Sequence, residues 1–293
     1  MLRNSERHYV RDATRRGRVL VVGDIHGQFE MFQRLLKLAE FDSAKDFVYA
    51  LGDLIDRGPD SPAVLNWFAS PGRSASLMGN HEAMMLDALD DFELGGIWWH
   101  NGGEWSRHVT PSTMHLYRCM ACQMPMTAEL VYPSDFRVGL IHANIRPGVA
   151  WSELENLGAK PGDFARDWDK IDSASALWGR SRFQADAFLR SVGDANTMSA
   201  DRRESVWKNI QPVEGIDLVI SGHSPIPNGL PRGRGNVLWI DTGAGNNGLL
   251  TAVDPYAWTY WQVGKEASEN WGPLDLPDLA PIPESLRPIS DQC

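Results

Sequence analysis

Three short apolar runs in the first third of the chain each end in a motif rich in metal-ligand residue types. Residues 19–22 lead into Gly-Asp-Ile-His-Gly, residues 47–51 into Gly-Asp-Leu-Ile-Asp-Arg-Gly, and residues 75–78 into Gly-Asn-His-Glu. Apolar runs of this length are typical of buried strands in a largely parallel sheet. Helical patterns at 29–39 and 64–68 separate the runs, so one βαβ unit of roughly 30 residues fits between successive motifs. We therefore expect all three motifs at one sheet edge, where open α/β sheets bind ligands.

The side chains expected at this edge favour a metal site. Asp24 and His26 are two positions apart, so an extended backbone directs both to one side of the strand. Asp53 and Asn80 join them from the next two motifs. A carboxylate beside an imidazole suits manganese, iron or zinc better than calcium or magnesium. Each residue alone could equally serve as a helix cap or turn residue, but their joint arrival favours metal binding.

In this order, the three motifs resemble the signature of the phosphoprotein phosphatase family of calcineurin-like metallophosphoesterases, especially its small bacterial and bacteriophage Ser/Thr members. Two further marks of the family follow downstream. Residues 140–143 read Leu-Ile-His-Ala, and Ser-Gly-His at 221–223 is followed by Trp-Ile-Asp-Thr-Gly-Ala at 239–244. The resemblance covers about residues 18–263. It implies an α/β (α+β) fold of two packed β-sheets flanked by helices, with a small helical insert.

The resemblance also implies a site with two divalent metal ions, manganese being favoured and iron or zinc being alternatives. Its expected ligands are Asp24, His26 and Asp53 for one metal, and Asp53, Asn80, His142 and His223 for the other. A hydroxide bridging the metals would attack phosphorus, and His81, oriented by Asp56, would protonate the leaving group. Arg57 and Arg180 would bind the phosphoryl oxygens. Arg182 remains an alternative to Arg180, because the motif around both is loose.

The rest of the chain is expected to complete this fold. Residues 92–125 read as a variable helical insert, in which Cys119 and Cys122 lack the second ligand pair that a structural zinc site needs. The expected strands are 127–132, 136–141, 217–220, 237–240, 249–253 and 258–263, and the expected helices are 151–157, 164–168, 174–178 and 202–210. We expect one domain over 18–263, a solvated basic arm at 1–17, and a proline-rich tail at 264–293.

Composition excludes several classes of partner. A formal net charge of −10 argues against nucleic acid as a partner, because phosphate backbones are bound by basic faces. No apolar run approaches 18 residues, so a membrane partner is not expected. Three cysteines suit a reducing, cytoplasmic location. The oligomeric state stays open, and the expected partner is a phosphoprotein or a phosphorylated small molecule.

Three functions compete for this chain. We predict a metal-dependent phosphomonoester hydrolase, specifically a Ser/Thr-type protein phosphatase. The alternative is a symmetrical diadenosine tetraphosphate hydrolase, whose relatives usually lack the aspartate at position 56 and read Gly-Asn-His-Asp where this chain has Glu82. A non-catalytic binding module would require a lost ligand or a lost general acid. Two departures from the phosphatase pattern are Met78, where an arginine is usual, and Ser224, where threonine is more frequent.

Overall fold

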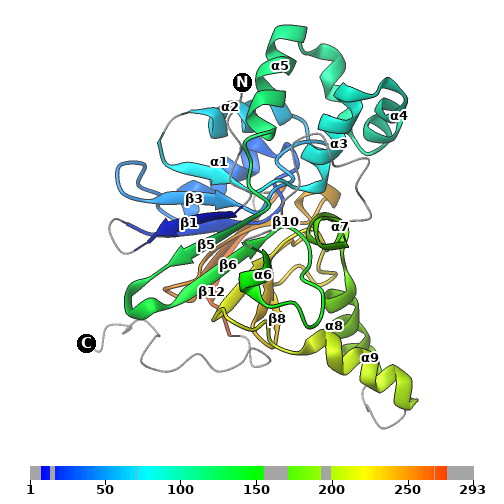
Figure 1. Cartoon of the computed structure of the whole chain (residues 1–293). Helices are drawn as coiled ribbons and strands as arrows, with labels where there is room; N and C mark the ends of the chain where they lie inside the picture. Colours follow the sequence, from blue (N-terminus) through cyan, green and yellow to red (C-terminus); the bar gives the residue numbers. More distant parts are fainter. Residues whose placement is uncertain are drawn as a thin grey trace.

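The computed structural model describes residues 8–13, 17–70, 72–154, 171–192, 199–266 and 268–275. These residues form two six-stranded mixed sheets with helices around them (Figure 1). The strand order is β12-β11-β10-β2-β3-β4 in the first sheet and β1-β5-β6-β7-β9-β8 in the second. The expected class, two packed sheets flanked by helices, is confirmed.

The first sheet contains the predicted βαβαβ unit. β2 (Val19–Val22), β3 (Phe47–Ala50) and β4 (Ser74–Ser76) are parallel neighbours, and α1 (Phe29–Leu38) and α2 (Ser61–Ala69) connect them. β10 (Leu249–Asp254), β11 (Thr259–Gly264) and β12 (Glu269–Pro273) extend the sheet in antiparallel pairing. The three motif-bearing loops therefore leave the same edge, as expected.

The second sheet brings the downstream motifs to a strand end of their own. Its strands are β1 (His8–Asp12), β5 (Thr127–Val131), β6 (Arg137–Ile141), β7 (Leu218–Ser221), β8 (Arg232–Arg234) and β9 (Val237–Trp239). β6, β7 and β9 are parallel neighbours, whereas β5 and β8 pair with their neighbours β6 and β9 in antiparallel fashion. His142 directly follows β6, and His223 lies two positions after Ser221, the last residue of β7.

The alternation of side chains explains why the first apolar runs are uninterrupted. Leu20 and Val22 of β2 pack into the core that the helices share, whereas Val19 and Val21 pack into the core between the two sheets. Successive strand residues point to opposite faces, and here both faces are covered. All four side chains are at most 1% exposed.

The expected helical insert is present. After α3 (Asn80–Asp90) the chain forms α4 (Phe92–His100), the 3₁₀-helix η1 (Gly103–His108) and α5 (Pro111–Ala121). α4 and α5 project together at one end of the molecule (Figure 1). α5 begins with proline in its first turn, and the Thr110 hydroxyl accepts from the backbone N–H of Thr113, which are features typical of a helix N-terminus.

The second half contains α6 (Trp151–Leu154), α7 (Ile171–Trp178), α8 (Ser181–Val192) and α9 (Ala200–Ile210). α6, α7 and α9 overlap expected helices, and the expected piece at 164–168 lies outside the described residues. α8 was not predicted. Its buried face includes the charged residues Arg182 and Asp186, at 3% and 0% exposure, so the apolar periodicity that identifies a helix is broken.

Two strands lie outside the expected domain of residues 18–263. β1 lies within the expected basic arm but pairs with β5, and the guanidinium of Arg11 sits 3.4 Å above the Phe47 ring. β12 lies within the expected tail but pairs with β11. Edge strands are held by backbone hydrogen bonds to one neighbour, which polar sequences such as these can make without an apolar pattern. Among the described helices, none is long and apolar enough to cross a membrane.

Candidate metal centre and active site

The backbone of the predicted site is strained. The residues concerned have left-handed φ angles between 47° and 72° and are His26, Asp53, Asp56, Arg57 and His223. This conformation is uncommon outside glycine, and such strain clusters at functional sites because the surrounding structure compels it. The six expected metal ligands are also buried, with at most 5% of any one exposed. Loops from both sheets therefore converge on one compact region.

Two groups of ligand atoms share Asp53. The ligand atoms of His26, Asp53 and His81 lie within 4.8 Å of one another, as do those of Asp53, His142 and His223. Asp53 Oδ2 is 3.6 Å from His26 Nε2, and Asp53 Oδ1 is 3.5 Å from His142 Nε2. The carboxylate therefore stands between two histidine groups, where a bridging ligand was expected.

The chemistry of the second group fits a cation. His142 Nδ1 lies 2.9 Å from the Leu51 carbonyl and donates its proton there, so Nε2 carries a lone pair. Burial lowers the pKa of His142, which keeps the ring neutral. Nε2 nevertheless faces the Asn80 Oδ1 acceptor at 2.9 Å, and the same oxygen lies 2.9 Å from His223 Nδ1. Two lone pairs directed at each other are satisfied when a metal ion lies among them, so the donor set fits a divalent metal.

Asp24 is buried next to His223. It belongs to neither ligand group, and its carboxylate accepts hydrogen bonds from the backbone N–H of His223 at 3.0 and 3.1 Å. Burial and the nearby Asp241 and Asp53 raise the pKa of Asp24 well above its ordinary value. Burial is also the largest cause that raises the pKa of Asp241 to about 6. A divalent cation would neutralise this concentration of buried carboxylates.

His81 forms the expected dyad with Asp56. His81 Nδ1 is 2.6 Å from Asp56 Oδ2, and both side chains are buried. Among the described residues, His81 Nε2 is buried without a hydrogen-bond partner and lies 3.9 Å from Asp53 Oδ2. Burial lowers the pKa of His81, but the charges of Asp53 and Asp56 outweigh that effect, so the pKa is raised. The ring therefore offers a protonated nitrogen to the centre of the site.

Two tryptophans for which the sequence predicts no role also bind Asp56. Trp98 Nε1 donates to Asp56 Oδ2 at 2.9 Å and Oδ1 at 3.2 Å, and Trp105 Nε1 donates to Oδ1 at 2.7 Å. Both come from the insert, on α4 and η1. The one available signal was their number, since the insert is rich in tryptophan, and nothing in that composition points to an acceptor at position 56.

Glu82 ties two of the motif loops together, a role not assigned from the sequence. Its carboxylate accepts hydrogen bonds from the backbone N–H groups of Asp53, Leu54 and Gly79, at 2.9, 2.8 and 2.9 Å. A Cβ at Gly79 would lie 2.2 Å from Asp53 Oδ1, so only glycine permits this approach. The glycine and the glutamate of Gly-Asn-His-Glu therefore serve to place Asp53.

The structure distinguishes the candidate arginines. Arg57 is exposed and donates from Nη1 to His26 Nε2 at 3.0 Å. Arg180 is exposed just after α7, close enough for its charge to join burial in lowering the pKa of His142 and of His223. Arg182 is buried and donates to the carbonyls of Ile145, Asn209 and Gln211. Arg182 therefore has a structural position, whereas the guanidinium of Arg180 is exposed.

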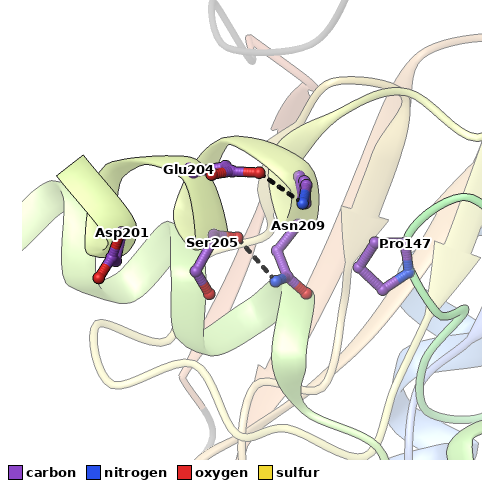
Figure 2. A pocket seen from close by; sticks show the side chains of 6 residues that line it. Pro147, Asp201, Glu204, Ser205 and Asn209 are labelled. Carbon is purple, nitrogen blue, oxygen red and sulfur yellow. Dashed lines mark hydrogen bonds and ion pairs between the residues drawn. The ribbon is translucent and has the colours of Figure 1, made fainter.

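A surface pocket of about 370 Å³ lies apart from this cluster, beside α9 (Figure 2). Its lining residues are Pro147, Asp201, Glu204, Ser205, Lys208 and Asn209, and none of them is a predicted site residue. Lys208, the one cation among these six, is paired with Glu204 at 2.6 Å. The pocket therefore lacks the uncompensated positive charge that a phosphate would need.

Comparison with known proteins agrees with the geometry. The family model described as Calcineurin-like phosphoesterase matches residues 17–227. A protein named serine/threonine-protein phosphatase 1, from Salmonella typhimurium, is 30% identical over 86% of this chain and 98% of its own length. A symmetrical bis(5'-nucleosyl)-tetraphosphatase from Cellvibrio japonicus is 27% identical over 79% and 93%.

A solved serine/threonine phosphatase from Saccharomyces cerevisiae shares the fold. It has a TM-score of 0.52 and 18% identity, and the alignment covers 86% of this chain and 78% of that chain. The family match at residues 17–227 includes all six expected metal ligands. The chain therefore belongs to the calcineurin-like phosphoesterase family and is a metallophosphoesterase, a hydrolase.

Proposed function

We propose that this metallophosphoesterase hydrolyses phosphomonoesters, and that phosphoserine and phosphothreonine in proteins are its substrates. The observation that carries the proposal is the buried His81–Asp56 pair, whose 2.6 Å contact leaves His81 Nε2 without a partner among the described residues. Hydrolysis of a serine phosphate expels an alkoxide, which needs a proton from a well-placed acid. A dyad of this kind provides it.

We further propose two divalent metal ions, because imidazole, carboxylate and amide-oxygen donors together suit manganese, iron or zinc, and we favour manganese on the family resemblance. The residues that would hold them are Asp24, His26 and Asp53 at one position, and Asp53, Asn80, His142 and His223 at the other. When bound, the metals supply Lewis-acid charge to the phosphoryl oxygens and to the attacking water. His81 is assigned to proton transfer because Asp56 already fixes its ring.

The remaining residues bind and orient the phosphoryl group. Arg57 and Arg180 both contribute charge at the buried carboxylate of Asp241, so both guanidinium groups border the site. A planar guanidinium can bind two phosphoryl oxygens at once and stabilise the charge that accumulates during transfer. His81 then donates its Nε2 proton to the departing oxygen, and the charge of Asp56 stabilises the imidazolium before the transfer.

Hydrolysis of a symmetrical dinucleoside tetraphosphate is the second candidate, because the Cellvibrio japonicus relative bears that name over most of its length. Its leaving group is a nucleoside diphosphate, which departs readily and needs an acid less. The Asp56 carboxylate, with its two neutral indole donors and its contact to His81, is therefore better explained by a monoester substrate. The two described cysteines, Cys119 and Cys122, are free thiols, which supports a reducing, cytoplasmic location.

The deciding experiment compares substrates at one manganese concentration. We expect kcat/KM for phosphoserine or phosphothreonine peptides to exceed that for diadenosine tetraphosphate at least roughly tenfold, equivalent to about 1.4 kcal/mol. A chelator should abolish both activities, and manganese should restore them. The reverse substrate order would transfer the assignment to the tetraphosphatase, and full activity of metal-free protein would contradict the metal centre itself.

A further inference from the structure

The insert supplies two hydrogen-bond donors to the catalytic dyad, although it contributes no expected metal ligand. Trp98 on α4 and Trp105 on η1 both direct their indole N–H groups at the carboxylate of Asp56. A single buried carboxylate with two indole donors and one imidazole donor is an unusual concentration of partners, since most side-chain hydrogen bonds in proteins go to backbone or water.

The donors fully occupy Asp56. Oδ1 accepts from Trp105 and Trp98, and Oδ2 accepts from Trp98 and from His81 Nδ1 at 2.6 Å. An ionised carboxylate offers about four lone-pair directions, so no orientation remains in which Asp56 could rotate without losing a partner. The side chain is therefore locked in the position that directs the His81 ring.

The chemical type of these donors matters. An indole N–H is neutral and donates only, so it stabilises the ionised carboxylate without cancelling its charge and without competing for the His81 proton. A lysine or arginine in the same position would pair with Asp56 and weaken its attraction for a protonated His81. Two tryptophans therefore preserve the negative charge that a general acid needs behind it.

The insert is also packed so that these indoles cannot easily move. The Trp98 and Trp105 rings are 5.9 Å apart in an edge-to-face arrangement, and Trp105 lies 6.2 Å from Tyr117 of α5. A Cβ on Gly103 would lie 2.5 Å from the Trp98 ring, and one on Gly102 would lie 2.5 Å from the backbone nitrogen of Arg57. The insert therefore contacts the Asp56–Arg57 loop directly.

We propose that Trp98 and Trp105 are positioning residues of the general acid, which act through Asp56 to hold the His81 ring with its Nε2–H directed at the leaving group. This inference rests on the proposed function, in which His81 is that acid. It makes the helical insert part of the catalytic machinery for substrates with poor leaving groups.

The test uses Trp105→Phe, which keeps an aromatic ring but removes the N–H. The two substrates are phenyl phosphate, with a poor leaving group, and 4-nitrophenyl phosphate, with a good one. We expect kcat to fall about tenfold on phenyl phosphate, equivalent to about 1.4 kcal/mol, and less than about twofold on 4-nitrophenyl phosphate. Both rates come from the same preparation, so their ratio is independent of the fraction that folds. Trp98→Phe serves as a second variant with the same expected ratio.

Trp99→Phe is the matched control, because Trp99 lies in the same insert and donates to Ser106 instead of Asp56. It should leave the ratio of the two rates unchanged. In a His81→Asn background the selective effect of Trp105→Phe should disappear, since no acid remains to be positioned. Equal losses on both substrates, or a Trp105→Phe effect that persists without His81, would overturn the inference. If His81→Asn alone lowered both rates equally, the assigned role of His81 would fail instead.

Discussion

Gly79→Ala tests whether the approach of two motif loops places the metal-ligand residues. Gly79 has φ −95° and ψ 173°, a conformation that alanine adopts without strain, so the substitution introduces no backbone strain. The added Cβ, however, would lie 2.2 Å from Asp53 Oδ1, 2.3 Å from the Asp53 backbone nitrogen and 2.9 Å from Glu82 Oε2. Because one of these atoms belongs to the backbone, a side-chain rotation cannot remove the clash.

The expected loss in the free energy of unfolding follows from the separation of the two loops that the added methyl group requires. Overpacking a tight site by one methyl group costs about 1–3 kcal/mol. Separating the loops also weakens the hydrogen bonds of Gly79 and Asp53 N–H to the Glu82 carboxylate, each of a type that contributes about 1.5–3 kcal/mol. Alanine recovers about 0.4–1 kcal/mol through a less flexible unfolded chain. If overpacking costs about 2 kcal/mol, the two hydrogen bonds together lose about 2 kcal/mol because they are only partly weakened, and the unfolded chain returns about 0.7 kcal/mol, the expected net loss in the free energy of unfolding is about 3 kcal/mol.

The free energy of unfolding is measured by urea denaturation of the metal-free protein, with tryptophan fluorescence as the signal. Gly96→Ala is the matched control, because Gly96 lies in α4 with no atom within 4 Å of the added Cβ. That variant should be stabilised by about 0.5–1 kcal/mol, the usual difference between alanine and glycine in a helix. Activity of Gly79→Ala should fall about 100-fold, since Asp53 is displaced by the order of an ångström.

A change of less than about 1 kcal/mol in the free energy of unfolding of Gly79→Ala, with parental activity retained, would be too small for overpacking and would show that the two loops are not tightly packed at this glycine. The loops would then be free to separate without cost. A large destabilisation with normal metal affinity would refute only the part that links Gly79 to the position of Asp53.

Three further variants test the remaining assignments. Arg182→Ala should lower the free energy of unfolding by about 3 kcal/mol, because three carbonyls lose a charged donor. Arg180→Ala should change it by less than about 0.5 kcal/mol and instead raise KM for a phosphopeptide. Urea titration and steady-state kinetics distinguish these outcomes, and equal effects of the two variants on stability would contradict the assignment. Asp56→Asn removes one of the charges that raise the pKa of His81. The protonated acid is lost on the alkaline side of the pH profile of kcat for phenyl phosphate, so this alkaline limb should move to lower pH. An alkaline limb at an unchanged or higher pH would count against the dyad.

Much of the fold was predictable because its signals are local. The uninterrupted apolar runs of β2 and β3 predicted strands covered on both faces, and the helical patterns between them predicted parallel pairing. The order of Asp24, Asp53 and Asn80 along these strands then implied convergence at one edge. Ligand chemistry is likewise a property of residue type, so the buried histidine and carboxylate groups around Asp53 could be anticipated.

Elements without a local signal were missed. α8 buries Arg182 and Asp186, which break the apolar periodicity, although each is satisfied by partners far along the chain. β1 and β12 are edge strands whose pairing depends on a neighbour instead of an apolar pattern. Met78 illustrates the same limit. The sequence suggests a lost charge beside the cleft, but the side chain is 1% exposed and packs in the core that the helices share.

The sequence by itself placed ligand-type residues of the first three motifs at one sheet edge, because that depends on residue type and on strand order, and the family resemblance added the expected His81–Asp56 pair. Only the tertiary structure decided that Asp24 caps the backbone of His223, and that Trp98 and Trp105 hold Asp56 from 42 and 49 positions away. A hydrogen bond is made over about 3 Å and within a narrow range of angles. Whether two residues so distant along the chain meet that geometry is set by the packing of the insert against the sheet edge, which no local pattern encodes.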